Sequence, residues 1–183
     1  MARIPYPKIE ELPEKIRSRT EKLPPLNILR LFMHAQTNVI PLLSLGTSIL
    51  TEQELDAKLR ELAILRVAHL TGANYEWTQH VPIAKQTGVT DAQVAAIRQG
   101  AEATAFTDLE KQVLRFTDEI TQQVRVSDAT FQALAAHLPP RQLVELALAT
   151  SFYGLAARMM ETSQVELEPT AGTYSVDQLR RGG

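Results

Sequence analysis

Titratable side chains gather in one apolar stretch of this sequence. Glu61, Arg66, His69, Glu76 and His80 fall within 20 positions, among leucine, isoleucine, valine, alanine and tryptophan. Removing a charged group from water is costly unless the group is paired, so such residues are usually kept out of apolar segments. The stretch therefore encodes either a paired structural network or an acid–base site.

Glu76 and His80 have the spacing of neighbours on a helix. Residues four apart share one helix face, and a carboxylate beside an imidazole can fix its tautomer and raise its pKa. That arrangement suits a general acid or base, although an inert surface pair has the same spacing. Glu61, Glu76 and His80 form our predicted catalytic set, in which His80 donates the proton and Glu76 orients His80 or relays the proton. Glu61 is expected to be a second relay or a polar anchor, unless it only pairs with Arg60 or Arg66 of the same or a neighbouring chain.

Arg66, Tyr75 and Trp77 are the candidate substrate-binding residues. Arg66 lies inside the apolar segment ILRVAHL, so it needs a carboxylate partner or must face a wet pocket, where it could hold a substrate carboxylate. Tyr75 and Trp77 flank Glu76 and suit packing, although the Tyr75 hydroxyl could also reach the same pocket. The separated carboxylates and single histidine step give little support for a metal site, so we expect neither metal nor cofactor.

The overall composition excludes several functional classes. The 183 residues suit one domain, and 19 basic and 21 acidic side chains are interspersed, with a net charge of −2. Because no basic block stands out, we expect no nucleic-acid partner and no anionic membrane surface. No apolar run approaches the roughly 20 residues of a membrane span, and the N-terminus lacks the apolar region of a signal peptide. We therefore expect a cytoplasmic protein that acts on a small molecule.

The chain contains no cysteine. This excludes disulfides, thiolate metal sites and any cysteine-based redox cycle within the chain. No glycine-rich phosphate loop or dinucleotide-binding fingerprint occurs either. The remaining chemistry is that of carboxylates, imidazoles and hydroxyls.

The apolar spacing predicts an all-α protein, a single-domain bundle of about seven to nine helices. Residues 1–25 form a proline-rich arm, residues 26–162 a helical domain, and residues 163–183 an extended tail. Hydroxyl residues followed by Glu or Gln three positions later predict helix starts at Thr51, Thr90 and Thr107. We expect helices near 8–19, 26–35, 41–50, 51–70, 74–87, 91–99, 107–124, 127–137 and 141–162, the fourth of them buried from Leu62 onwards.

The site residues resemble those of the carboxymuconolactone decarboxylase family, which includes the alkyl hydroperoxidase D-like proteins. The resemblance extends over residues 26–161 and is strongest from residue 61 to residue 88. The hydroperoxidase branch carries a proton-relay Glu, a C-x-x-C pair and a His four residues after the second Cys. Glu61 and His80 fall on the relay positions, and Ala73 and Glu76 fall on the two cysteine positions.

Further spacing in this stretch supports the same resemblance. His80, Ala84 and Gly88 continue the family pattern H-x-x-x-A-x-x-x-G. The triplet at 75–77 with His80 is similar to the cysteine-free, decarboxylase-like branch. The resemblance implies an all-helical homo-oligomer, a trimer or a hexamer, with a small-molecule site near a subunit boundary. It also implies that dithiol peroxidase chemistry is lost.

The expected activity is cofactor-free acid–base chemistry, as in a decarboxylase-like lyase acting on a small carboxylated lactone or related unsaturated acid. Isomerisation, hydrolysis or addition–elimination on a related molecule needs the same proton-transfer groups and stays open. A third possibility is a non-enzymatic oligomeric binding protein in which the Glu, Arg and His network holds subunits together. A closed, fully paired network without an adjacent cavity would favour that last alternative.

Overall fold

The computed structural model describes residues 2–21 and 23–174, and within these residues the fold is all-α, with nine α-helices, two 3-10 helices and no strand. The predicted fold class is thereby confirmed. In chain order the elements are η1 (Ile9–Glu11), α1 (Glu14–Thr20), α2 (Asn27–Phe32), α3 (Val39–Thr51), α4 (Ala57–Thr71), α5 (Asn74–Gln86), α6 (Asp91–Ala96), η2 (Ile97–Glu102), α7 (Asp108–Gln123), α8 (Asp128–Ala135) and α9 (Pro140–Ser163).

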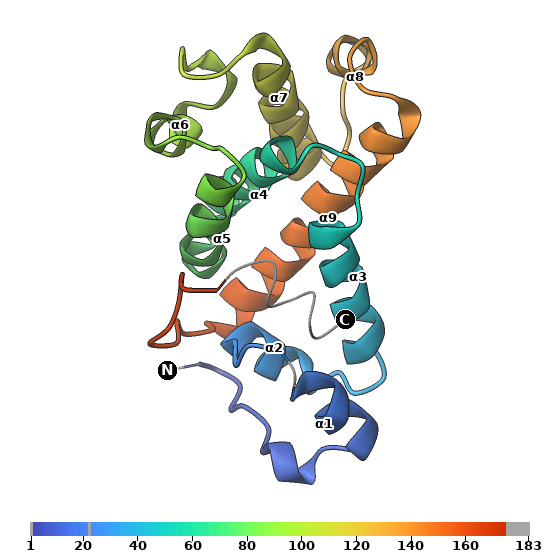
Figure 1. The fold of residues 1–183 in the computed structure, drawn as a ribbon, viewed down its shortest axis with the longest axis vertical. Coiled ribbons are helices and arrows are strands. Elements are labelled where there is room, and N and C mark those ends of the chain that lie inside the picture. The colour runs from blue at the N-terminus through green and yellow to red at the C-terminus, as the bar shows by residue number, and fades with distance from the viewer. Residues whose placement is uncertain (1, 22, 175–183) are drawn as a thin grey trace.

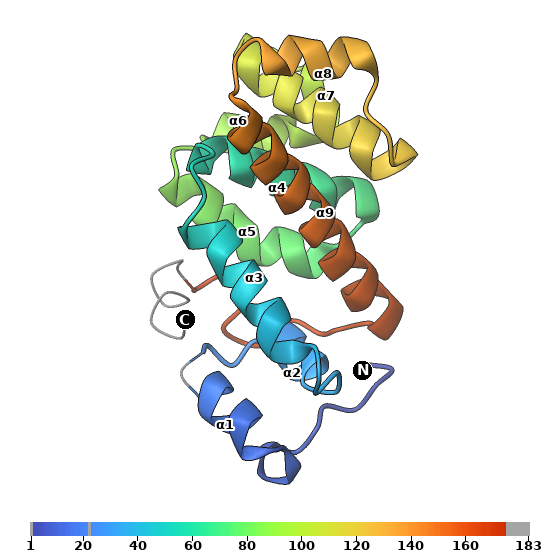
Figure 2. The same cartoon turned by 90° about the vertical axis from the view of Figure 1, so that its right-hand side faces the viewer.

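Helix α4 forms the centre of the bundle. It packs against α5, α7 and α9, and every residue from Leu59 to Ala68 is buried. The long helix α9 crosses the molecule beside α3 and α4, with α1 and α2 at one end and α7 and α8 at the other (Figures 1 and 2). A helix enclosed on all sides must carry apolar residues all round, which explains the lack of a polar face on α4.

The turn between α4 and α5 brings two parts of the titratable stretch together. Gly72 ends α4 with φ +70°, a left-handed conformation that glycine adopts without a Cβ clash. The chain reverses there, and α5 returns along α4, so residues far apart in the stretch face each other. Pro82 lies inside α5 without ending it, and Gly88, with φ +96°, follows the helix as predicted.

Two of the three predicted capping boxes are present. Thr90 caps α6 and Thr107 caps α7, each with the reciprocal hydrogen bond from the side chain three residues on. The prediction at Thr51 was wrong: this residue ends α3, and its hydroxyl donates to the Thr47 carbonyl of the same helix at 2.8 Å. Helix α4 begins instead after Asp56, whose carboxylate accepts from the backbone amides of two residues of the first turn, Lys58 and Leu59.

The two ends of the chain pack against the helical body. Leu12 and Ile16 are buried in one cluster with Phe32 and Met160. After α9 the chain returns across α5, where the Gly172 amide donates to the Gln79 side chain at 3.0 Å. Residues 175–183 of the predicted tail lie outside the described residues.

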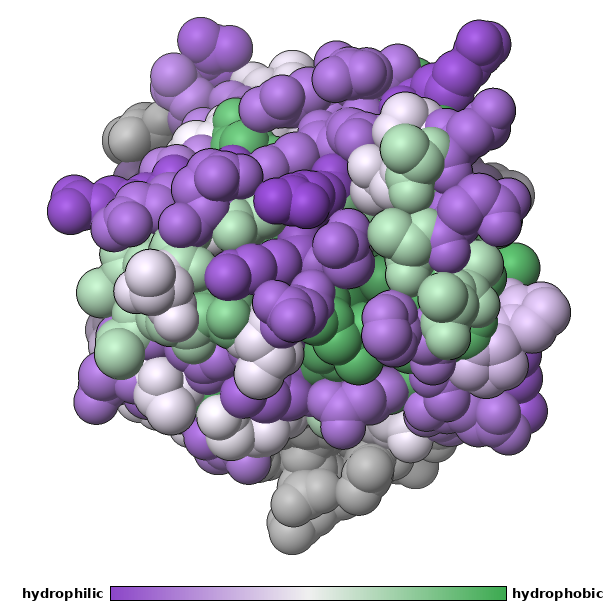
Figure 3. All heavy atoms as spheres, turned by 90° about the horizontal axis from the view of Figure 1, so that it is seen from above, coloured by the Kyte–Doolittle hydropathy of each residue, from purple (hydrophilic) through white to green (hydrophobic). Residues whose placement is uncertain are grey.

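The outer surface is mainly polar at the end built by α6, α7 and α8, with apolar patches among the polar side chains (Figure 3). Helix α9 is long and apolar enough to cross a membrane by length and composition, but half of its most apolar window is buried inside the protein. The core helix of a globular protein has the same property.

The observed cap gives a stability prediction. Replacing Asp56 with Ala removes the acceptor for two amides and should cost about 1 kcal/mol, or about 2–4 °C in Tm for a chain of this length. The control is Thr51→Ala, which removes no cap and should change the free energy of unfolding by less than about 0.5 kcal/mol. Thermal unfolding followed by circular dichroism distinguishes the two, and the reverse order of effects would contradict the assigned cap.

Candidate active site

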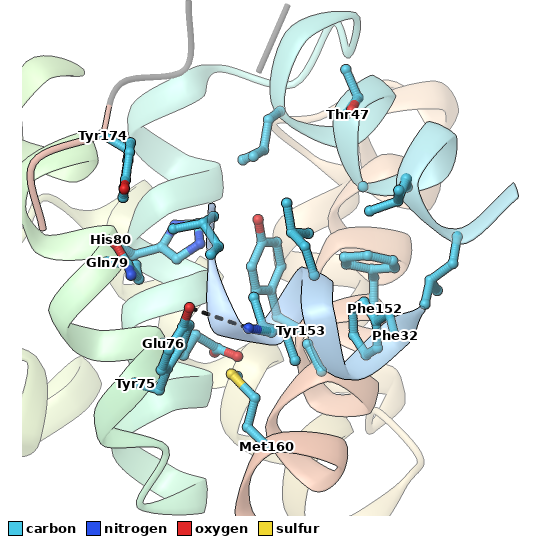
Figure 4. Close-up of a pocket in the computed structure, with 18 of the residues that line it drawn as sticks. Phe32, Thr47, Tyr75, Glu76, Gln79, His80, Phe152, Tyr153, Met160 and Tyr174 are labelled. Carbon is cyan, nitrogen blue, oxygen red and sulfur yellow. Dashed lines mark hydrogen bonds between the residues drawn. The ribbon is translucent and has the colours of Figure 1, made fainter. Parts of the chain in front are cut away.

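A cavity of about 140 Å³ opens between α2, α3, α5 and α9. Most of its wall is apolar, with Phe32, Phe152 and Met160 among the larger side chains (Figure 4). Polar atoms come mainly from α5, which contributes Tyr75, Glu76, Gln79 and His80, and from Tyr153 on α9. A small apolar pocket with a few converging polar groups is the usual form of a small-molecule site.

His80 is held by a carboxylate buried in the core. Its Nδ1 lies 2.9 Å from Oε2 of Glu61, whose side chain is fully buried, and the other Glu61 oxygen accepts from the Arg60 guanidinium at 3.3 Å. A carboxylate only accepts hydrogen bonds, so a carboxylate at Glu61 pairs with the tautomer of His80 that carries its proton on Nδ1, and Nε2 can then exchange a proton with a ligand. The structure therefore brings Glu61 and His80 together within one chain.

Glu76 does not make the contact that the sequence suggested. It was expected to orient His80, but Glu61 does so, and neither carboxyl oxygen of Glu76 has a hydrogen-bond partner among the described residues. Glu76 is only 2% exposed. Burial raises the pKa of its carboxyl well above the ordinary value, and the negative charges of Glu61 and Glu161 raise it further. Glu76 is thus a buried, unpartnered carboxyl that lines the cavity, in surroundings that favour its protonated form.

Tyr153 completes the polar part of the cavity, and no sequence pattern indicated it. Its ring packs edge to face against His80, with centroids 4.7 Å apart. Burial raises the pKa of its hydroxyl well above the ordinary value, and the charge of Glu61 adds to this, so the group stays a neutral donor. Tyr153 is 73 positions beyond His80 on another helix, and no local spacing links the two.

Arg66 does not line the cavity. Its guanidinium makes a two-pronged ion pair with Asp118, at 2.5 and 3.0 Å, and also donates to the carbonyl oxygens of Ile97 and Arg98. These contacts use the planar donor fork of the arginine between α4, α7 and η2. Arg66, which we predicted to hold a substrate carboxylate, is therefore not part of the site that we propose.

The two aromatic candidates lie in different places. Trp77 is half-buried against an apolar cluster of α4, α5 and η2, and is not among the residues that line the cavity. Tyr75 does line the cavity, but its hydroxyl donates to Glu168 at 2.9 Å and accepts from the Ile28 amide at 3.3 Å. Its polar atom is therefore already used in the cavity wall.

Glu168 is a second polar element that the sequence did not reveal. It follows α9, is buried, and accepts hydrogen bonds from the Tyr75 hydroxyl, the Gln79 side chain and the Asn27 amide. These contacts join the segment after α9 to α2 and α5 at one wall of the cavity. Among the described residues, no group of three or more His, Cys, Asp or Glu side chains is arranged to hold a metal ion.

Sequence comparison finds a family match over part of the chain. Residues 42–119 match the model of the carboxymuconolactone decarboxylase family. No curated protein sequence matches the chain.

Solved structures share the fold at low sequence identity. A peroxidase-related protein with an alkylhydroperoxidase AhpD core, from Ralstonia eutropha JMP134, is 18% identical, with a TM-score of 0.79 over 99% of this chain and 96% of that one. A peroxidase-related protein from Silicibacter sp. TM1040 is 14% identical, with a TM-score of 0.79 over 93% and 94%. The debrominase Bmp8, as a cysteine-to-alanine variant in complex with 2,3,4-tribromopyrrole, is 16% identical, with a TM-score of 0.73 over 97% and 93%. These likenesses concern the fold alone.

The raised pKa of Glu76 predicts a pH-dependent stability. A carboxyl whose pKa is higher in the folded than in the unfolded state stabilises the fold at low pH, and this contribution is lost as the pH rises through the folded-state pKa. Replacing Glu76 with Gln removes the titration. We expect a Tm gain of about 2–4 °C at pH 8, corresponding to about 1 kcal/mol, that shrinks towards zero at pH 4.

Thermal unfolding from pH 4 to pH 8 measures this difference. Glu10→Gln is the matched control, because Glu10 is exposed and its charge is not among those that raise the Glu76 pKa, so its substitution should leave the pH dependence almost unchanged. A Tm difference between Glu76→Gln and wild type that is the same at every pH would show that Glu76 titrates normally.

Proposed function

We propose that this protein is a cofactor-free acid–base enzyme that moves protons on a small molecule in the cavity. The observation that supports this most strongly is the buried Glu61 carboxylate, 2.9 Å from Nδ1 of a histidine that lines the cavity. This is the arrangement by which a carboxylate orients an imidazole and stabilises the imidazolium that forms during proton transfer.

The proton path follows from the tautomer. Neutral His80 takes a proton at Nε2 from a carbon next to a carbonyl, and the C–H electron pair moves into a new C=C bond while charge develops on the carbonyl oxygen. Where the substrate also carries a C=C bond beside that carbon, the negative charge extends over it, and the imidazolium returns the proton to the far carbon of that bond. The C=O bond then re-forms and the original C=C bond has shifted by one position. The net result is an isomer of the substrate, and the step needs no oxidant, reductant or other co-reactant.

Decarboxylation of a carboxylated lactone needs an additional group. A substrate carboxylate that enters an apolar cavity must be compensated by a cation or by hydrogen-bond donors. Arg66 is occupied by Asp118, and none of the described residues that line the cavity is a lysine or an arginine. The geometry therefore supports proton transfer without loss of carbon dioxide better than the lyase reaction.

The other candidate activities have less support. The Bmp8 structure carries a cysteine-to-alanine substitution and a bromopyrrole, but this chain has no thiol with which to carry out cysteine chemistry. A purely structural role for the network is disfavoured because the Glu61–His80 pair borders a cavity and Glu76 is unpartnered. The resemblance to the cysteine-free branch agrees with acid–base chemistry.

Replacement of His80 tests the proposed role directly. His80→Gln should lower kcat by about 10²–10⁴, the usual contribution of a general acid–base group. The assay is exchange of substrate carbon-bound protons with D2O, followed by NMR for a panel of small lactones and unsaturated ketones, with carbon dioxide release measured from γ-carboxymuconolactone. His69→Gln is the matched control, because His69 is exposed at the end of α4 and should leave kcat unchanged.

Each alternative has its own result in this assay. Carbon dioxide release that disappears in His80→Gln would replace isomerisation by the decarboxylase reaction. Full turnover in that variant would remove His80 from the mechanism. If wild type exchanges nothing, and His80→Gln lowers only the Tm or the oligomer size, the network is structural.

We also propose that the chain forms a homo-oligomer, a trimer or a hexamer. Helix α9 exposes four large apolar side chains, those of Val144, Leu148, Leu155 and Met159. Exposed apolar patches are typical of protein–protein interfaces. Light scattering of the purified protein should give a mass of three or six subunits. Val144→Glu, on this exposed face, should lower the mass, whereas Gln142→Glu is the control of equal charge change; a monomeric wild type would contradict the proposal.

A further inference from the structure

Glu76 differs from the other buried carboxyl groups of the described chain. Glu61, Glu110 and Glu168 each have hydrogen-bond partners. Glu76 is equally buried, lines the cavity, and has none on either oxygen. A buried polar group without a hydrogen-bond partner destabilises the fold. The unpartnered carboxyl of Glu76 therefore points to a ligand that supplies the missing partner when it binds.

The cavity itself limits what that ligand can be. Its volume of about 140 Å³ is close to that of engineered apolar cavities that take benzene. The wall is mostly apolar, with the aromatic rings of Phe32, Phe152 and Tyr153 on it (Figure 4). A single flat ring with few polar atoms fits both the size and the lining.

The charges around the cavity disfavour an anion. No lysine or arginine lines it among the described residues, and the guanidinium of Arg60, whose charge acts on the cavity residue Tyr153, is bound to Glu61. Glu61 and Glu161 place negative charge near Glu76 instead. An anionic ligand would lose its hydration and meet like charge, without compensation.

We infer that the cavity takes a neutral, ring-sized, mostly apolar molecule with one hydrogen-bond acceptor, a carbonyl or similar oxygen, and that Glu76 donates a hydrogen bond to that oxygen. The inference rests on the proposed function in one respect: the acceptor is the carbonyl next to the carbon on which His80 acts. A protonated carboxyl has one O–H donor, and burial raises the Glu76 pKa, which favours this form.

Helix geometry gives Glu76 and His80 complementary roles. Four residues apart on α5, they lie on one face with Cβ atoms about 5–6 Å apart. A carbonyl oxygen at Glu76 thus brings the neighbouring carbon towards the His80 imidazole. Charge that develops on the oxygen during proton removal then lies at a fixed donor in an apolar site, where such stabilisation is strongest.

Binding of four probes of similar size tests the ligand class independently of turnover. The probes are acetophenone, ethylbenzene, benzoate and benzylamine, titrated into the full-length protein at pH 7 by calorimetry. We expect acetophenone to bind, and benzoate and benzylamine to bind at least about tenfold more weakly because each carries a charge into an apolar cavity.

Variants of Glu76 test the hydrogen bond. Glu76→Leu should weaken acetophenone about five- to tenfold, while ethylbenzene binds as before or more tightly. Glu76→Gln should keep acetophenone within about threefold, because the amide still donates. Glu10→Gln, at an exposed residue outside the cavity lining, should change the binding of neither ligand. His80→Gln should bind acetophenone normally, so loss of turnover in that variant leaves the ligand assignment intact.

Four results would overturn the inference. Benzoate binding as tightly as acetophenone would remove the preference for neutral molecules. Benzylamine binding most tightly, with release of a proton, would make Glu76 an ionised partner for a cation. Unchanged acetophenone binding in Glu76→Leu would remove the hydrogen bond, and failure of wild type to bind any of the four probes would remove the ligand class.

Discussion

The carboxylate of Glu61, fully buried at the centre of the bundle, requires compensation from its surroundings. Arg60 supplies one contact from the same helix, and His80 supplies the other from α5. The second contact depends on the reversal at Gly72, which returns α5 along α4. A buried charge thereby fixes the position of one helix against another, since an unpaired carboxylate in the core is among the costliest defects a fold can carry.

Three glutamates around the cavity show how burial and partners give one residue type three roles. Glu61 is held beside a guanidinium and an imidazole and suits a charged partner for His80. Glu168 accepts three hydrogen bonds and holds the segment after α9 against the cavity wall. Glu76 has no partner, and burial favours its protonated form. A carboxyl whose pKa is raised by burial beside a cavity, as that of Glu76 is, is typical of acid–base sites.

The sequence predicts the parts of this structure that depend on local pattern. Helical spacing, the caps at Thr90 and Thr107, and the burial of α4 are encoded within a few turns of chain. The cap at Asp56 was missed because Thr51 offers the same local pattern, and only the fold shows that its hydroxyl bonds within its own helix. Local pattern is ambiguous where two capping residues lie within five positions of each other.

Contacts between distant segments account for the features of the site that the sequence does not predict. The titratable stretch pointed to Glu61, Glu76 and His80, but not to which carboxylate holds the histidine, because helix spacing favours Glu76 and only packing brings Glu61 closer. The pairing of Arg66 with Asp118 spans 52 positions, and the contact of Tyr75 with Glu168 spans 93. Neither is visible in a sequence pattern, and each decides whether a candidate is free to meet a ligand.

The absence of cysteine gives the proposed chemistry its direction. By the family resemblance, Ala73 and Glu76 stand where the hydroperoxidase branch has its two thiols, while Glu61 and His80 stand on the relay positions. Here Ala73 is buried without exposed surface, and Glu76 lines the cavity as an unpartnered acid. Replacing a thiol by a carboxyl removes a nucleophile that can exchange electrons and leaves a group that can only donate or accept protons. Without a thiol, the proposed acid–base chemistry depends on carboxyl and imidazole groups, which exchange protons without a change in their own oxidation state.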